Sequence, residues 1–335
     1  MITNFVTTVL ILGGIYALLA LGLNLQFGFA GLINFGIVGY FAAGAYGYAI
    51  LTAPAPTTLD YYRVGLGWPA WAGVIGGCAV AVIVAALTSW PCLRLRGDYL
   101  ALMTFGFAQV IQVILTNASP LTNGTLGFST FLPPFSLQAG VHYPWVLSII
   151  VSVALILVFL VLRRIERSPY GRILQMIRDD ELAATLAGKS CASYRLQAFV
   201  IGGAVFGLAG VCFAWYNNNV NPSQFDVLLT ITVFVSIALG RFRSAPGAVL
   251  GAFVLVALQQ AASQFGTQLS PAVGIRLGGA TIALEGAFLV VMLRANARNS
   301  SRFSRRRRMP GNDLPADDSL TASTAASQLP VGRVK

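Results

Sequence analysis

The chain has 335 residues, of which 56% are hydrophobic and only 10% are charged, and its mean hydropathy is +0.73. This composition excludes a soluble globular protein and indicates a polytopic membrane protein. The formal net charge is +11. The basic residues lie between hydrophobic segments and near the C-terminus, so positive-inside topology explains them better than nucleic-acid binding does.

The cysteines and the histidine predict neither a metal site nor a disulfide framework. The four cysteines have no paired spacing, and the single histidine, His142, cannot complete a metal site with them. No clustered acids lie at membrane depth, so no catalytic set is visible and the chain is not expected to be an enzyme. We therefore expect no catalytic residues, no metal and no cofactor bound by this chain.

Hydrophobic windows long enough to cross a membrane core of about 30 Å predict an all-α protein with about nine transmembrane segments, within a range of eight to ten. The windows fall at about 5–25, 29–52, 69–90, 99–117, 144–162, 196–216, 227–240, 246–266 and 277–293. The second segment could be broken or re-entrant. The window 227–240 is short, and predicts a half-helix or a helix that begins in the preceding loop.

The basic residues set the predicted orientation. With the N-terminus outside and both 163–195 and the C-terminus in the cytoplasm, only Arg63 and Arg276 lie outside. The predicted permease domain covers residues 1–293. From residue 294 to 335 the composition becomes polybasic and then rich in Pro, Ser, Thr, Ala and Asp, which predicts a disordered cytoplasmic tail.

Several polar residues interrupt the apolar segments. Small residues in the first two segments predict close helix packing, and Asn24, Gln26 and Asn34 lie among them. These amides either bond between helices or line a polar pathway. Glu285 lies near the middle of the last window, where it is either a protonated acid bonded to a neighbouring helix or a functional group. The possible translocation-pathway residues are Asn24, Asn34, Thr104 and Glu285.

The stretch 163–195 is the only long polar run between hydrophobic segments, with seven basic and four acidic residues. A helix is expected to begin at Pro169 after an N-cap serine, and to run to about Arg178. A second short helix follows Asp180 and ends at Gly188. Such helices form either an amphipathic loop on the lipid surface or a surface that docks another protein. The expected apolar face of the first helix consists of Ile173, Met176 and Ile177.

Residues 177–201 (IRDDELAATLAGKSCASYRLQAFVI) carry a family resemblance. They resemble the cytoplasmic EAA-type loop of ABC importer permeases, specifically the branched-chain amino acid permease family of the LivH/LivM type. The residues that match the loop's pattern are Arg178, Asp179, Glu181, Ala183, Ala184 and Gly188. The stretches 22–36, 93–110, 221–226 and 246–252 match in the same order, and 93–110 is closer to LivM. Lys189 and Ser190 depart from the pattern.

The resemblance implies the membrane-spanning subunit of an ATP-driven importer in the cell (inner) membrane, most simply for branched-chain amino acids. It implies a second permease subunit, two cytoplasmic ATPase subunits that bind the ATP, and an extracytoplasmic substrate-binding protein. The six matching loop residues would couple the chain to an ATPase. Urea or short amides are an alternative cargo in the same family. A stand-alone secondary transporter or channel that uses Glu285 is an alternative of another class.

Overall fold

The fold is that of a computed structural model. Its described residues are 2–55, 62, 65–92, 95, 97–129, 133–134, 140–240 and 243–273. All of them belong to one compact unit, Met1–Ala287. The predicted segment 277–293, with Glu285, and the tail 294–335 lie outside the described residues.

The described residues are almost entirely helical, which confirms the predicted all-α class. The β-pairing among them is an isolated bridge between Phe128 and Val220. In chain order the elements are α1 (Ile2–Leu23), the π-helix η1 (Asn24–Phe29), α2 (Ile37–Thr52), α3 (Ala70–Cys92), α4 (Asp98–Asn117), α5 (Ser119–Thr122), η2 (Gly140–His142), α7 (Tyr143–Arg167), α8 (Pro169–Asp179), α9 (Glu181–Leu186), α10 (Cys191–Asn217), η3 (Pro222–Gln224), α11 (Val227–Gly240) and α12 (Ala245–Val273).

Six segments of the described residues are long and apolar enough to cross a membrane. They are Thr3–Phe29, Ala70–Cys92, Asp98–Asn117, Tyr143–Arg167, Cys191–Asn217 and Pro222–Gly240. Two further apolar helices, α2 and the Ala245–Ala261 part of α12, are shorter. The count of nine spans and the orientation of the termini stay predictions.

Of the alternatives for the predicted segment 29–52, the structure shows the broken one. The chain leaves the helical conformation after η1 and reaches the left-handed region at Gly31, with φ of 69°, where glycine has no Cβ to clash. The side chain of Asn34 then accepts the amide of Gly36 at 2.7 Å, and α2 begins at Ile37. The helix that follows this break has 16 residues and is too short for a full crossing.

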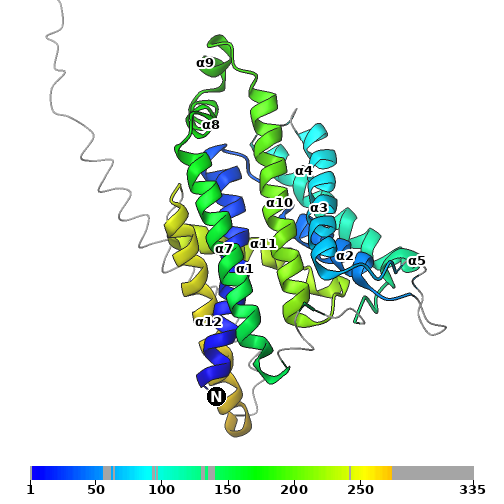
Figure 1. The fold of residues 1–335 in the computed structure, drawn as a ribbon. Helices are drawn as coiled ribbons and strands as arrows, with labels where there is room; N and C mark the ends of the chain where they lie inside the picture. The colour runs from blue at the N-terminus through cyan, green and yellow to red at the C-terminus, as the bar shows by residue number, and fades with distance from the viewer. Residues whose placement is uncertain are drawn as a thin grey trace, which may run out of the picture. The chain divides into compact units, whose positions relative to one another are not determined.

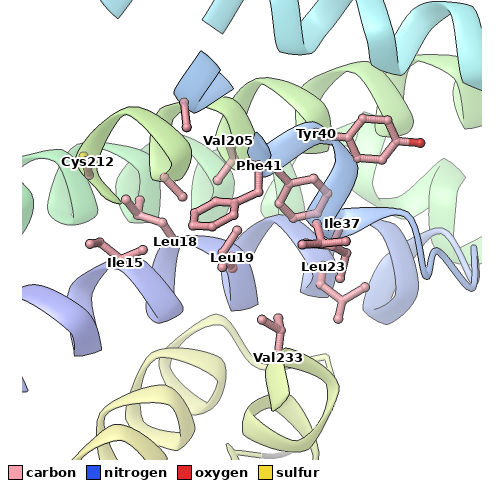
Figure 2. Close-up of a cluster of buried hydrophobic side chains, with 14 of the residues drawn as sticks. Ile15, Leu18, Leu19, Leu23, Ile37, Tyr40, Phe41, Val205, Cys212 and Val233 are labelled. Carbon is pink, nitrogen blue, oxygen red and sulfur yellow. The ribbon is translucent and has the colours of Figure 1, made fainter. Parts of the chain in front are cut away.

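α2 lies at the centre of the packing, because 13 of its 16 residues are buried. It packs against α3, α4 and α10, and α1 packs against α10, α7 and α12. Figure 2 shows the shared core, in which Phe41 of α2 lies between Leu18 and Leu19 of α1 and Val205 of α10. Such contacts stabilise the bundle through close van der Waals packing, since lipid tails are as apolar as these side chains.

Glycines allow α10 to approach α2 closely. A Cβ on Gly44 would lie 2.3 Å from the carbonyl oxygen of Gly207, and one on Gly210 would lie 2.1 Å from that of Phe41. Backbone atoms cannot move aside as a flexible side chain can, so both positions require glycine. This confirms the expectation that small residues in these segments serve helix packing.

Candidate functional site

The polar stretch 163–195 folds into the two short helices that its sequence predicts. α8 and α9 join the end of α7 to the beginning of α10, and Figure 1 shows them at the end of these helices that lies away from the N-terminus. Ser168 occupies the N-cap position of α8, but its hydroxyl donates to the carbonyl of Ile165 at 2.6 Å and does not cap the helix. The two helices form a hairpin that protrudes from the membrane-spanning bundle.

α9 is defined at both ends by local contacts. The Asp180 carboxylate accepts the amide of Ala183 at 3.0 Å, which is the N-cap contact expected at that position. Asp179 is the last residue of α8 and is exposed. Gly188 has φ of 72°, the left-handed conformation that ends many helices, so the predicted stop is confirmed. A six-residue helix needs such end contacts because it has few backbone hydrogen bonds of its own.

One face of α9 is fixed to its neighbours. The Glu181 carboxylate pairs with the Arg195 guanidinium of α10 at 2.9 Å, with the two side chains 22% and 14% exposed. Ala184 is fully buried and packs with Ile177 of α8 and Cys191 of α10. The predicted stack of Ile173, Met176 and Ile177 belongs to this same small core. Glu181 and Ala184 therefore hold α9 in place and face the chain's own helices.

The opposite face of α9 carries apolar side chains that this chain does not cover. Leu182 is 70% exposed and Leu186 is 81% exposed. They are four residues apart, so they lie on one side of the helix, and Ala183 is exposed beside them. A helix that docks in the groove of a partner typically anchors through apolar side chains at positions i and i+4, as Leu182 and Leu186 are placed here.

Arg178 points inward to the end of the first span. Its guanidinium donates to the carbonyl of Gly28 in η1, and its aliphatic stem lies against Gly31, where a Cβ would come within 2.7 Å. Burial and the nearby Arg243 lower the pKa of Arg178. An arginine pKa starts so high that the group still keeps its charge at neutral pH. Arg178 is half-buried and ties α8 to η1.

η1 is a junction between several helices. The Asn24 amide donates to the Glu166 carboxylate of α7 at 3.2 Å and accepts the backbone amide of Arg243 at 3.1 Å. Arg243, which lies between α11 and α12, also donates to the side chain of Gln175 in α8 at 3.5 Å. η1 is the π-helical end of the helix that α1 begins. Here it gathers groups from α7, α8 and the α11–α12 turn.

The hydrogen bonds continue from η1 toward the interior. Gln26 donates to the Phe199 carbonyl of α10 at 3.1 Å and accepts the Asn34 amide at 2.8 Å. The backbone amide of Phe35 donates to the Thr104 hydroxyl of α4 at 3.0 Å. Asn24, Gln26, Asn34 and Thr104 are all fully buried. Bonding between segments, one of the two alternatives from the sequence, therefore accounts for these amides.

The structure brings together some predicted site residues and separates others. Asn24, Asn34 and Thr104 belong to one connected region with Arg178. Glu285, the fourth pathway residue, lies outside the described residues. Glu166 and Arg243 were missed from sequence, since they are 142 and 219 residues from Asn24 and no local pattern relates them. Within the described residues, no group of three or more His, Cys, Asp or Glu side chains could hold a metal ion.

The helices and their arrangement define a multi-pass α-helical membrane protein. Residues 5–295 match the family described as branched-chain amino acid transport system / permease component, and the chain belongs to this family. It is 34% identical over 75% of its length to the high-affinity branched-chain amino acid transport system permease protein LivM of Salmonella typhimurium, and the match spans 62% of that relative. The chain therefore matches less than two thirds of this relative's length.

Two other relatives extend the comparison. A probable branched-chain amino acid transport permease protein LivM of Methanocaldococcus jannaschii is 26% identical, over 81% of this chain and 85% of the relative. The permease protein LivH of Salmonella typhimurium is 25% identical, over 73% of this chain and 80% of the relative. Identity is higher to the LivM proteins, as the stretch 93–110 predicted. No solved structure matches the chain.

Proposed function

We propose that this chain is a membrane-spanning subunit of an ATP-driven importer of branched-chain amino acids, and that α9 docks into a groove on a separate ATPase subunit. The observation that carries the docking proposal is the exposed pair Leu182 and Leu186 on a helix whose other face is fixed. The names of the relatives support the cargo. The ATP would be bound by the partner subunits.

The roles of the six loop residues divide by position. Ala183 is exposed on α9 near the two leucines and would contact the ATPase, while Asp179 and Gly188 are exposed at the ends of the two helices. Glu181 and Ala184 would act by holding α9 at a fixed angle to α10. Arg178 would pass movement of α8 to η1. The hairpin of α8 and α9 would transmit movement of the ATPase to the spans only if it is rigid. Its contacts with the chain's own helices are therefore as necessary as its contacts with the ATPase.

The hydrogen-bonded groups beyond η1 offer a route from this hairpin to the spans. Movement of α8 would displace Gly28 through Arg178. In the same region Gln26 is bonded to α10, and Asn34 is bonded to Gln26. Asn34 precedes α2, the short helix at the centre of the packing. A shift there would change how α2 packs against its neighbours, which is the kind of movement that alternating access requires. The pathway would thus depend on Asn24, Asn34 and Thr104 because they pass the movement to α2, not because they contact the cargo.

The other parts of the assembly follow the same proposal. A second permease subunit is consistent with relatives named both LivM and LivH. An extracytoplasmic binding protein would deliver the amino acid. The complex would lie in the inner membrane, with the N-terminus outside and α8 and α9 in the cytoplasm, where ATP is available.

The docking proposal is tested by changing the two exposed leucines. Leu182→Asp with Leu186→Asp should abolish ATP-dependent leucine uptake and co-purification of the ATPase, because charged groups cannot enter an apolar groove unpaired. The matched control is Leu126→Asp, since Leu126 is also exposed but lies in the loop between α5 and η2. The control should insert, co-purify and transport normally. Normal uptake by the double variant would refute docking through α9.

A further inference from the structure

The C-terminal end of α7 carries an open groove lined by both apolar and cationic side chains. Its volume is about 840 Å³, and its lining residues are Leu160, Val161, Arg163, Arg164, Arg167 and Ser168. Arg164 and Arg167 are exposed and Arg163 is half-buried. This groove lies on the outside of the span and is distinct from α9 and from the contacts of η1.

The apolar part of the groove continues a stripe along α7. The exposed residues of this stripe are Ile149, Val153, Ile156, Leu157, Leu160 and Val161. Their spacing of three and four residues places them on one side of the helix, and Arg164 follows Leu160 by four residues and Val161 by three. An apolar stripe exposed over several turns of a membrane span is a surface for acyl chains. The stripe thus ends at the guanidinium groups.

The positive charges of the three arginines are only partly compensated by the nearby Glu166. Glu166 lies between them in sequence and attracts Arg163 and Arg167 through space, but its carboxylate forms its hydrogen bond with the Asn24 amide. Within the described part of the chain, no ion pair is formed by Arg163, Arg164 or Arg167. Arg163 instead lies over the ring of Phe159, with 5.7 Å between its guanidinium carbon and the ring centroid. That contact holds one side of the groove while Arg164 and Arg167 stay open to a ligand.

We propose that this groove binds one anionic phospholipid, with its phosphate between Arg164 and Arg167 and its acyl chains along Leu160 and Val161. A phosphate suits guanidinium groups because they donate in a planar fork to its oxygens. Basic pockets between membrane helices on the cytoplasmic side bind acidic lipid headgroups on this principle. The apolar stripe selects a lipid over a free anion, and the net positive charge selects an anionic headgroup over a zwitterionic one.

The test is native mass spectrometry of the purified full chain in detergent, titrated with phosphatidylglycerol and with phosphatidylcholine. The test variant is Arg164→Gln with Arg167→Gln. The matched control is Arg172→Gln with Lys189→Gln, which removes the same charge from exposed positions in α8 and after α9. The basic tail is present in every variant, so lipid bound there does not separate them.

The wild-type chain and the control should hold one phosphatidylglycerol tightly and prefer it to phosphatidylcholine. Each basic residue near an anionic surface contributes about 1 kcal/mol, which is about fivefold in affinity, so the test variant should lose on the order of 25-fold. Equal loss in both double variants would overturn the site. So would displacement of the lipid by inorganic phosphate at equal concentration. The same measurement on the complete transport complex is a further test. If the lipid is absent there because a second subunit covers the arginines, the site is overturned as well.

Discussion

Gln26 should be sensitive to substitution, because its side chain bonds two other segments at once. Gln26→Leu removes the bond to the Phe199 carbonyl and the bond from the Asn34 amide. Interhelical hydrogen bonds in membranes contribute about 0.6 kcal/mol on average and at most about 1.7. The Asn34 amide would also be left buried without its acceptor, which costs about 1–3 kcal/mol. With two bonds lost and one amide left without an acceptor, the free energy of unfolding should fall by about 2–4 kcal/mol.

The assay is unfolding of the purified chain in mixed micelles, followed by circular dichroism as the denaturing detergent is increased. The control is Gln112→Leu, since Gln112 lies half-buried on α4 and none of the hydrogen bonds among the described residues involves its side-chain amide. The control should be neutral. The double variant Gln26→Leu with Asn34→Leu should lose less than the sum of the single changes, because the pair is removed together. Equal stability of Gln26→Leu and Gln112→Leu would refute the importance of this contact.

Two further changes test the packing and the hairpin. Gly210→Leu should destabilise the bundle by more than the usual cost of overpacking, which is about 1–3 kcal/mol, because its side chain would meet the Phe41 carbonyl. The control is Gly106→Leu, which has open space around it and should fold normally in the same assay. Asp180→Ala should cost about 1 kcal/mol of α9 stability through loss of the N-cap, seen as faster hydrogen exchange of the Ala183 amide. Asp179→Ala should leave that exchange unchanged, and an equal acceleration in both would show that charge and not capping matters.

The sequence predicted the parts of the fold that depend on local chemistry. Pro169, Asp180 and Gly188 mark the ends of α8 and α9, because proline, carboxylate caps and left-handed glycine act within a few residues. Apolar windows located most spans for the same reason. The break before α2 is only one of the alternatives that the sequence allows, since Gly31 and Asn34 could equally occupy a continuous helix.

The site was less predictable, because its contacts join residues far apart in the chain. Polarity at membrane depth singled out Asn24 and Asn34, but it could not identify Glu166 or Arg243 as partners. The pattern of 177–201 singled out Ala184 without distinguishing a buried position from an exposed one. Burial is set by how α9 turns against α8 and α10, and only the folded chain fixes that angle.

We propose above that the exposed face of α9 contacts an ATPase subunit. The most direct measurement places a photo-crosslinking amino acid at Leu186 in cells that carry the complete transport system, with Leu126 as the comparison position. We expect a crosslink from position 186 to the ATPase subunit and none from position 126. An ATPase that co-purifies with the chain while position 186 crosslinks only to lipid would contradict it.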